Sequence, residues 1–439
     1  MAAKSTPLKL ELAQLSDLGM RRANNQDSLI SVVTDEPGTW TRRGHLMMVA
    51  DGMGAHAAGE LASKLAIDNL PHAYYKSTES SPAIALRQAV CRANEIINTK
   101  GQNSVDFRGM GTTCTCLVLI SQGALVAHVG DSRAYRLRGT SFQQLTFDHS
   151  LVWEAAAAGQ LPAEGMVNVL PRNVITRSLG PHKTVNVDLE GPFDIVEDDI
   201  FLVCSDGLNG EITDLEIGTI LGVLPPQEAA QTLVDFANLR GGSDNISVVI
   251  AKVPREPAGP ESSTSNTLGT SSTSPRGRIG LGLRSILLAC LALFFIFLAI
   301  GSPWAAVICA VGLGVSVAVA AVRWLVPPRT FKPTANAKGP YGSGPYRDYD
   351  CQPSQLVVEA LEEIARQLHK LAQQDNWLTE KKWQQIETHQ KLATEAVKAD
   401  NLAVAIAEYC HMIRRAMQQL RGQKETATTQ SATNLDENS

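Results

Sequence analysis

The sequence lacks several features that would assign it to a class of protein at once. Its 439 residues carry a net charge of −5, so no excess of basic residues indicates nucleic-acid binding. The eight cysteines include no C-x-x-C pair, which argues against a zinc ribbon, and we interpret them as reduced thiols, as on a cytosolic face. No apolar core follows the short polar start, so we expect no signal peptide.

A regular alternation of strands and helices is also missing, which disfavours a doubly wound parallel sheet. Residues 8–15 alternate apolar and polar side chains with period two, and this pattern predicts a strand. Short apolar runs predict further strands at 28–33, 46–50, 113–120, 125–129, 134–137, 185–189, 199–204 and 246–253. Helical spacing is found at 57–70, 82–98, 149–158 and 226–239. The first part of the chain is therefore predicted to be a β-rich α+β domain.

The composition changes at Pro254. Residues 255–280 are rich in Ser, Thr, Pro and Gly and predict a flexible linker. Two apolar runs, 286–300 and 305–322, contain no charged residue and predict two transmembrane helices within 281–326. Arginines flank both ends, so we expect a multi-pass protein of the cytoplasmic membrane whose flanking domains lie in the cytoplasm. The alternative is a buried helical hairpin in a soluble domain.

The last part of the chain is predicted to be helical. Residues 327–353 are rich in Pro and Gly and predict a second linker. Apolar residues then recur at spacings of three and four, which predicts a C-terminal all-α domain at 354–421 with an unknown protein partner. A plain helical bundle or a coiled-coil dimer module explains this segment, and one tetratricopeptide-like hairpin is the alternative. Residues 422–439 are polar and are predicted to be disordered.

Five aspartates stand at the ends of predicted strands or beside them. Asp51 follows the apolar run 45–50, and a buried carboxylate is very costly without a partner or a metal. The others are Asp27, Asp131, Asp206 and Asp244, and a glycine lies within two positions of four of the five. Mg²⁺ and Mn²⁺ prefer oxygen ligands, whereas no cluster of His or Cys indicates zinc. The pattern predicts a metal centre in which Asp51 bridges two ions, although any single Asp-Gly pair indicates only a turn.

Eight motifs, in order along about residues 8–253, resemble those of the bacterial type 2C, metal-dependent protein serine/threonine phosphatases (the PPM family). They are S-D-L-G-M-R-R-A-N-N-Q-D, V-A-D-G-M-G-A-H-A-A-G-E, G-M-G-T-T, H-V-G-D-S-R-A-Y-R-L, L-T-F-D-H-S-L, V-I-T-R-S-L-G, L-V-C-S-D-G-L and G-G-S-D-N-I-S-V-V. Their number and order make the resemblance specific. It does not extend to the apolar runs or to the helical segment.

The resemblance implies a fold and a reaction for residues 8–254. The fold would be a four-layer α/β/β/α sandwich of two antiparallel sheets. The reaction would be hydrolysis of phosphoserine and phosphothreonine on cytosolic proteins by a metal-bridging hydroxide, with two core Mn²⁺ or Mg²⁺ ions and a place for a third. The expected partners are phosphorylated proteins and, by family habit, a cognate kinase. No Cys-x5-Arg loop indicates a covalent phosphoenzyme.

The resemblance also implies roles for the metal ligands. Asp51 would be the carboxylate shared by both core ions, and the carbonyl of Gly52 would be a ligand of the second ion. Asp206 and Asp244 would be ligands of the first ion. Asp131, together with Asp206, would hold a third and weaker ion.

The remaining positions of the expected site include two departures from the family pattern. Asp27 would lie near the second ion, but the preceding Gln26 stands where relatives commonly carry Glu. Arg22 matches the arginine that holds the substrate phosphate through its planar fork of donors. Met53 stands where eukaryotic relatives carry a histidine proposed as the general acid. His56 is therefore the candidate general acid, and a structural hydrogen bond is its alternative role.

The retained aspartates favour an active, membrane-tethered phosphatase. A catalytically weak pseudophosphatase that binds phosphoproteins at the membrane as a scaffold is one alternative. A metal-dependent hydrolase of small phosphoesters is another, because the phosphate site recognises little besides phosphate. Metal-dependent release of phosphate from a phosphothreonine peptide would exclude the scaffold.

Overall fold

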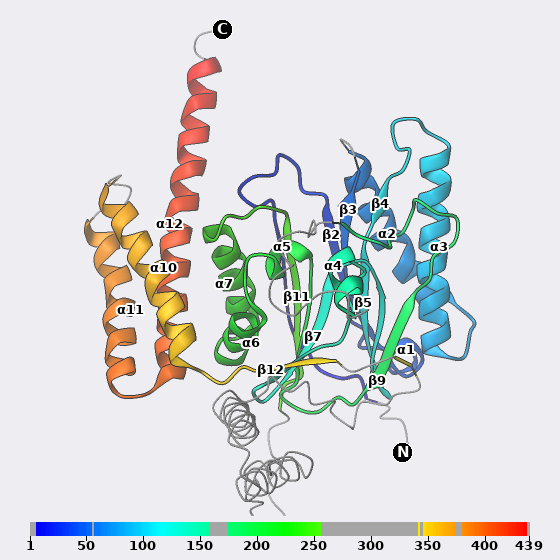
Figure 1. Ribbon diagram of the computed structural model, residues 1–439, viewed down its shortest axis with the longest axis horizontal. Helices are drawn as coiled ribbons and strands as arrows, with labels where there is room; N and C mark the ends of the chain where they lie inside the picture. Colours follow the sequence, from blue (N-terminus) through cyan, green and yellow to red (C-terminus); the bar gives the residue numbers. More distant parts are fainter. Residues whose placement is uncertain are drawn as a thin grey trace, which may run out of the picture. The chain divides into compact units, whose positions relative to one another are not determined.

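The computed structural model describes residues 6–54, 57–157, 174–255, 341–342, 346–374 and 380–436 (Figure 1). These residues belong to one compact unit that combines Met1–Glu256 with Pro333–Ser439. Several predictions concern parts of the chain outside the described residues. These are His56, nearly all of the first predicted linker, and the apolar runs at 286–300 and 305–322.

Two six-stranded antiparallel sheets lie within the described residues. The first has the order β1-β11-β10-β7-β8-β12. Its strands are β1 (Glu11–Asp17), β7 (Arg133–Arg138), β8 (Ser141–Gln144), β10 (Ile200–Cys204), β11 (Ile246–Lys252) and β12 (Arg347–Asp350). The second has the order β2-β3-β5-β6-β9, with β4 paired to β3. Its strands are β2 (Asp27–Val32), β3 (His45–Met53), β4 (Gly111–Thr112), β5 (Cys114–Ile120), β6 (Gly123–Val129) and β9 (Asp188–Phe193).

The central strands are continuous apolar runs because both of their faces are buried. In β3, Met47 and Val49 belong to the hydrophobic cluster that also contains Phe201 and Val249 of the first sheet. The alternate residues Leu46, Met48 and Ala50 belong to a second cluster on the other face. Successive side chains of a strand point to opposite faces, so a strand covered on both sides needs apolar residues at every position.

Helices cover the outer faces of the sheets (Figure 1). In the part of the chain that the structure describes, the helices before β12 are α1 (Pro37–Arg43), α2 (Ala58–Lys76), α3 (Pro82–Gln102), α4 (Leu151–Ala157), α5 (Asp206–Asn209), α6 (Asp214–Val223) and α7 (Pro226–Leu239). α2 and α3 pack on the second sheet, where Leu70 and Leu86 join its outer cluster. α6 and α7 pack on the first sheet, where Ile217 and Leu233 join its outer cluster. The expected pair of antiparallel sheets with helices is confirmed.

Three helices follow β12 in the described part of the chain: α10 (Gln355–Gln374), α11 (Glu380–Lys398) and α12 (Leu402–Asp436). Ile406 and Ile413 of α12 belong to the same hydrophobic cluster as Leu233 of α7. The helices therefore form a bundle that packs on the first sheet's helices. The prediction of disorder from residue 422 is wrong as far as Asp436, because residues after Gly422 include no proline and many good helix formers.

The segment predicted to be the second linker, 327–353, contains the strand β12. This strand pairs with β8, and Tyr349 lies opposite Phe142 in the ladder. The preceding Tyr346 is buried, stacks on Phe147 and makes an edge-to-face contact with Phe193. These aromatic contacts anchor the end of the segment to the sheet, so the linker prediction fails at 346–350.

The expected membrane hairpin at 281–326 lies outside the described residues. Among the residues that the structure does describe, no helix combines the length and the apolar character needed to cross a bilayer. α12 is 35 residues long but carries Arg414, Arg415 and Arg421. This finding contradicts the expected multi-pass location in the cytoplasmic membrane.

Candidate active site

Five carboxylates from both sheets converge at one edge of the sandwich. Asp51 lies in β3 directly opposite Asp27 of β2. Asp131 stands between β6 and β7, and Asp206 begins α5 immediately after β10. Asp244 precedes β11. The other four carboxylates each raise the pKa of Asp51, so all five lie within electrostatic reach of it.

Burial and mutual repulsion raise the pKa values of three of these carboxylates. Burial is the main reason why the pKa of Asp27 is raised to about 7, and the charges of Asp206 and Asp244 add to it. Hydrogen bonds from nearby serines lower the pKa and offset part of this rise. Burial and the charge of Asp206 raise the pKa of Asp131 to about 8. The pKa of Asp51 lies well above its ordinary value because of burial and the four neighbouring carboxylates.

Divalent cations would relieve this repulsion. The Oδ1 atoms of Asp27, Asp131 and Asp206 are buried and have no hydrogen-bond partner among the described residues. Buried polar atoms are normally paired, so three orphaned oxygens in one cluster indicate an absent ligand. The donors are all oxygens, which suits Mg²⁺ or Mn²⁺ better than zinc. The residues therefore fit the metal pair that the sequence predicts.

Gly52 is required by close packing of backbone. A Cβ atom there would lie 2.1 Å from the carbonyl oxygen of Gly59 and 2.6 Å from that of Gln26. The amide of Gly52 also donates to the carbonyl oxygen of Gln26 at 3.1 Å. No side chain fits between the end of β3, the start of α2 and the segment before β2. Whether the Gly52 carbonyl binds an ion stays a prediction.

Arg22 lies at the rim of the carboxylate cluster. Its Nη2 atom is 2.6 Å from Asp244 Oδ2, and 46% of its side chain is exposed. The structure therefore brings Arg22, Asp27, Asp51, Asp131, Asp206 and Asp244 into one site, as the sequence predicts. A guanidinium at the open side of a metal-binding cluster is suited to bind a phosphate group.

Known proteins match this same part of the chain. The family model described as Protein phosphatase 2C matches residues 20–218. Protein phosphatase PhpP of Streptococcus pneumoniae is 38% identical over 255 residues, which are 57% of this chain and 100% of that protein. The chain belongs to the protein phosphatase 2C family.

Other relatives agree with this membership. Serine/threonine phosphatase stp of Listeria welshimeri is 35% identical over 213 residues, which are 47% of this chain and 84% of that protein. The structure of the serine/threonine phosphatase PstP/Ppp of Mycobacterium tuberculosis has 33% identity and a TM-score of 0.50, and the match covers 56% of this chain and 99% of that one. The serine/threonine phosphatase of S. agalactiae has 35% identity and a TM-score of 0.50, with 56% and 100% covered. The expected enzyme class and the expected dependence on Mn²⁺ or Mg²⁺ are confirmed.

Sequence reasoning missed Asn245, which holds the loop that carries Arg22 in the phosphatase. Its Nδ2 atom donates to the carbonyl oxygens of Leu18 at 2.8 Å and Asn24 at 3.1 Å. Its Oδ1 atom accepts from the amide of Gln26 at 2.8 Å. One buried amide side chain thus fixes three points of a loop more than 200 residues away in sequence. The signal was its place beside Asp244 in the motif G-G-S-D-N.

Buried hydroxyl groups position the carboxylates from behind. Ser205 Oγ donates to Asp27 Oδ2 at 2.7 Å. Thr113 Oγ1 accepts from the amide of Asp51 at 2.9 Å and lies 2.8 Å from Ser132 Oγ. Ser132 directly follows Asp131, so this pair of hydroxyls links the backbone of Asp51 in β3 to the connection between β6 and β7 that carries Asp131. Nothing in the spacing of these residues predicts the link.

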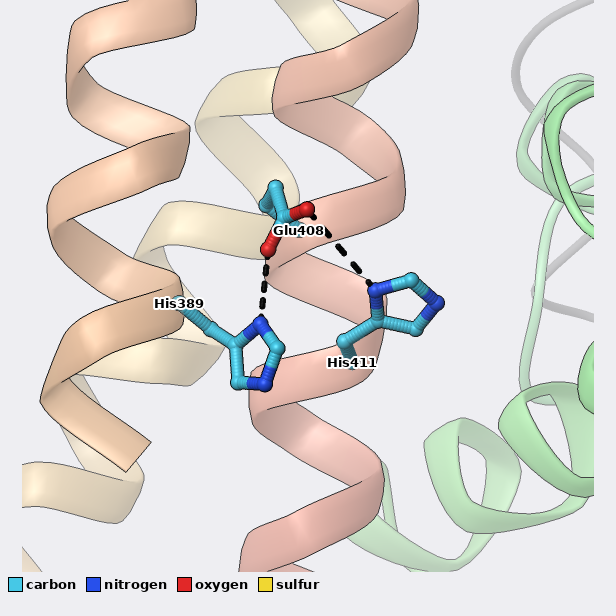
Figure 2. Close-up of side chains that lie close together, drawn as sticks. All are labelled: His389, Glu408 and His411. Carbon is cyan, nitrogen blue, oxygen red and sulfur yellow. Dashed lines mark hydrogen bonds and ion pairs between the residues drawn. The ribbon is translucent and has the colours of Figure 1, made fainter. Parts of the chain in front are cut away.

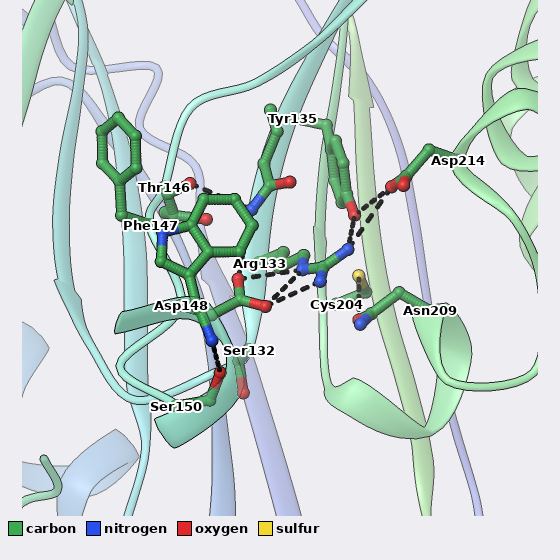
Figure 3. A network of polar contacts seen from close by, with 12 residues as sticks. Ser132, Arg133, Tyr135, Thr146, Phe147, Asp148, Ser150, Cys204, Asn209 and Asp214 are labelled. Atoms are coloured by element: carbon green, nitrogen blue, oxygen red, sulfur yellow. Dashed lines mark hydrogen bonds and ion pairs between the residues drawn. The ribbon is translucent and has the colours of Figure 1, made fainter. Parts of the chain in front are cut away.

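Arg133 fixes the chain after Asp131 (Figure 3). Its guanidinium lies 2.6 Å from Asp148 Oδ2 and 3.5 Å from Asp214 Oδ1. Tyr135 donates to the same Asp214 oxygen at 2.7 Å. Figure 3 shows Arg133 between the two carboxylates, which come from different segments of the domain. The arginine therefore stabilises the fold of the phosphatase behind the site.

His56 lies outside the described residues, and so does the segment 159–171, whose irregular sequence predicts a loop where the family has a mobile flap. The role of His56 as general acid stays a prediction. His149, by contrast, is structural: Nδ1 accepts from the amide of Gly130 at 3.0 Å, and Nε2 is 2.9 Å from Asp188 Oδ2.

Proposed function

We propose that the phosphatase hydrolyses phosphoserine and phosphothreonine on proteins at the cluster of Asp27, Asp51, Asp131, Asp206 and Asp244. The observation that carries this proposal is a cluster of carboxylates that raise one another's pKa values and that include three buried oxygens without a hydrogen-bond partner among the described residues. A cluster of this charge repels a phosphate group unless cations neutralise it. Metal dependence therefore follows from the residues themselves.

Each metal ligand has a proposed role. Asp51 would be shared by the two core ions, the Gly52 carbonyl and Asp27 would serve the second ion, and Asp206 and Asp244 would serve the first. Asp131 with Asp206 would hold a third, weaker ion. Such ions would lower the pKa of water and offset charge on the phosphoryl oxygens.

Arg22 binds and orients the substrate. Its guanidinium presents several N–H donors in one plane, which matches two phosphoryl oxygens, whereas lysine offers a point charge. The contact with Asp244 holds it next to the cluster. His56 is proposed to donate a proton to the leaving serine or threonine oxygen as the bond to phosphorus breaks.

The test is phosphate release from a phosphothreonine peptide by the full-length protein. We expect turnover with Mn²⁺ and none with a chelator. Asp206→Asn should reduce turnover to less than a few per cent while thermal unfolding stays cooperative, because the variant loses one ligand of the first ion. The exposed Asp106→Asn is the matched control and should keep full activity. Metal-dependent binding of the phosphopeptide without turnover would indicate a scaffold instead.

The remaining organisation is also a proposal. Residues 8–254 would form the phosphatase domain as a four-layer α/β/β/α sandwich, supported by three hydrophobic clusters between and outside the sheets. Residues 354–421 would form the helical domain, and the linkers would be 255–280 and the part of 327–353 that precedes Tyr346. The substrates are proteins phosphorylated by a cognate serine/threonine kinase. The protein partner expected for the helices stays a prediction.

A further inference from the structure

A cluster of two histidines and a glutamate joins α11 to α12, outside the carboxylate site. Glu408 and His411 lie three residues apart on α12 and therefore share one face of that helix. His389 of α11 faces them, with Nδ1 2.6 Å from Glu408 Oε2. His411 Nδ1 lies 4.0 Å from Glu408 Oε1. Figure 2 shows the two imidazoles on either side of the Glu408 carboxylate.

These three side chains match the donor set of a zinc ion. One atom from each side chain lies within 4.8 Å of the others, so small rotations would bring all three to about 2.0–2.2 Å from a common ion. Two imidazole nitrogens favour Zn²⁺ over Mg²⁺, in contrast to the all-oxygen carboxylate site. The side chains are 19%, 20% and 30% exposed, so they are held by packing and still reachable by an ion.

Glu228 of α7 supports His411 from behind. His411 Nε2 lies 2.9 Å from Glu228 Oε2, and Arg414 contacts the same oxygen. Burial acts to raise the pKa of Glu228, but Arg414 and His411 outweigh it and lower the pKa overall. The carboxylate is therefore charged and accepts a hydrogen bond from the Nε2–H group of His411. Histidines that bind metals commonly donate their other ring N–H to a carboxylate in this way.

The contact between His411 and Glu408 is unfavourable while the imidazole is neutral. When neutral His411 carries its proton on Nε2, its Nδ1 has only a lone pair, and that lone pair faces a carboxylate oxygen of Glu408 at 4.0 Å. Either a second proton on the ring or a cation between the two atoms would make the contact favourable, and only the cation would join all three side chains.

We propose that His389, Glu408 and His411 bind one Zn²⁺ ion. The ion would tie α11 to α12 and, through Glu228, hold both against α7 of the phosphatase domain. This site is separate from the proposed catalytic centre and does not depend on it.

The test is a calorimetric titration of the metal-free full-length protein with Zn²⁺ in a large excess of Mg²⁺, which competes for the carboxylate site. We expect one Zn²⁺ per chain in the wild type and in Asp206→Asn. His389→Gln and His411→Gln should lose this binding, whereas the exposed control His72→Gln should retain it. Glu228→Gln should bind Zn²⁺ about 10–100-fold more weakly, as loss of an outer partner usually does.

A second measurement protects the test against misfolded variants. Zn²⁺ should raise the Tm of the wild type and of Asp206→Asn, but not that of His411→Gln or Glu408→Gln. Absence of Zn²⁺ binding by the wild type in Mg²⁺ would overturn the proposal. Binding to both histidine variants with wild-type affinity would also overturn it, and the cluster would then be an ion-pair network only. Loss of binding in Asp206→Asn would place the ion in the catalytic centre instead.

Discussion

Without divalent ions, the phosphatase should become less stable as the pH rises from about 4 to about 8. In the folded chain Asp27 has a pKa of about 7 and Asp131 of about 8, against an ordinary value of 3.8. Burial is the main cause in both, and neighbouring carboxylates add to it. Between 3.8 and these values the folded chain binds more protons than the unfolded chain. These groups therefore contribute full stability below pH 3.8, and the contribution is lost as the pH rises through the folded pKa values.

The size of this loss follows from the shifts. One pKa unit corresponds to about 1.36 kcal/mol. The rise of Asp27 by about three units is therefore about 4 kcal/mol, and the rise of Asp131 by about four units is about 6 kcal/mol. Both carboxylates are repelled by Asp206, so the two figures need not add fully, and the expected loss for the pair lies between about 6 kcal/mol, the value for Asp131 alone, and about 10 kcal/mol, the sum. In a chain of this size, that loss corresponds to a fall in Tm of roughly 10 °C.

The assay is thermal unfolding at several pH values, with saturating Mn²⁺ and with a chelator. The gap between the two Tm values should widen as the pH rises, because bound ions offset the repulsion. Other titrating groups affect both conditions and largely cancel in this gap. Asp131→Asn should stabilise the chelated protein at pH about 8, since an amide carries no charge. A Tm of the chelated wild type that stays constant or rises over this range would refute the reasoning.

Three further changes test the site and its support. Gly52→Ala should cost about 3 kcal/mol in urea unfolding and most of the activity, because its Cβ would lie 2.1 Å from a backbone oxygen. Asn245→Ala should raise KM for a phosphopeptide about tenfold, because it frees the loop that carries Arg22. Arg421→Met should cost about 3 kcal/mol, because it removes the ion pair of the buried Asp235, while kcat at low denaturant stays unchanged. An unchanged unfolding midpoint would contradict the prediction for Gly52→Ala or for Arg421→Met, and an unchanged KM would contradict the prediction for Asn245→Ala.

The sequence predicts the carboxylate site because its signals are local. Each aspartate lies near the end of a strand, and the apolar runs that mark strands such as β3 are continuous because both faces are buried. Asp27 is the least marked, since no glycine stands near it, but its pairing with Asp51 follows once β2 and β3 are antiparallel neighbours. The eight motifs in order add the remaining specificity.

The supporting contacts could not be predicted, because they join residues far apart in sequence. Asn245 reaches Leu18 across 227 positions, and Ser205 reaches Asp27 across 178. Asp235 and Arg421 resemble surface charges in sequence, yet the structure buries the aspartate in an ion pair. A local pattern contains no information on which distant side chain will meet it.

The amino-acid composition changes at Pro254, but the folded unit does not end there, because residues after Pro333 belong to the same compact unit. The guanidinium carbon of Arg347 in β12 lies 3.5 Å from the ring centroid of Trp153 in α4, so the strand that follows Pro254 contacts a helix that precedes it. α12 is ion-paired to α7 through Arg414 and Arg421.

α7 in turn ends at Leu239, and the chain then runs directly into the segment that carries Asp244 and Asn245. Gly242 in this segment accepts a hydrogen bond from the amide of Met20, at 2.8 Å, in the loop of Arg22. The helix that α12 holds in place therefore leads into residues that position both the carboxylate cluster and the phosphate-binding arginine. The helical bundle and the catalytic site are thus connected through one short stretch of backbone, and α7 is the element that contacts the bundle and leads into the site.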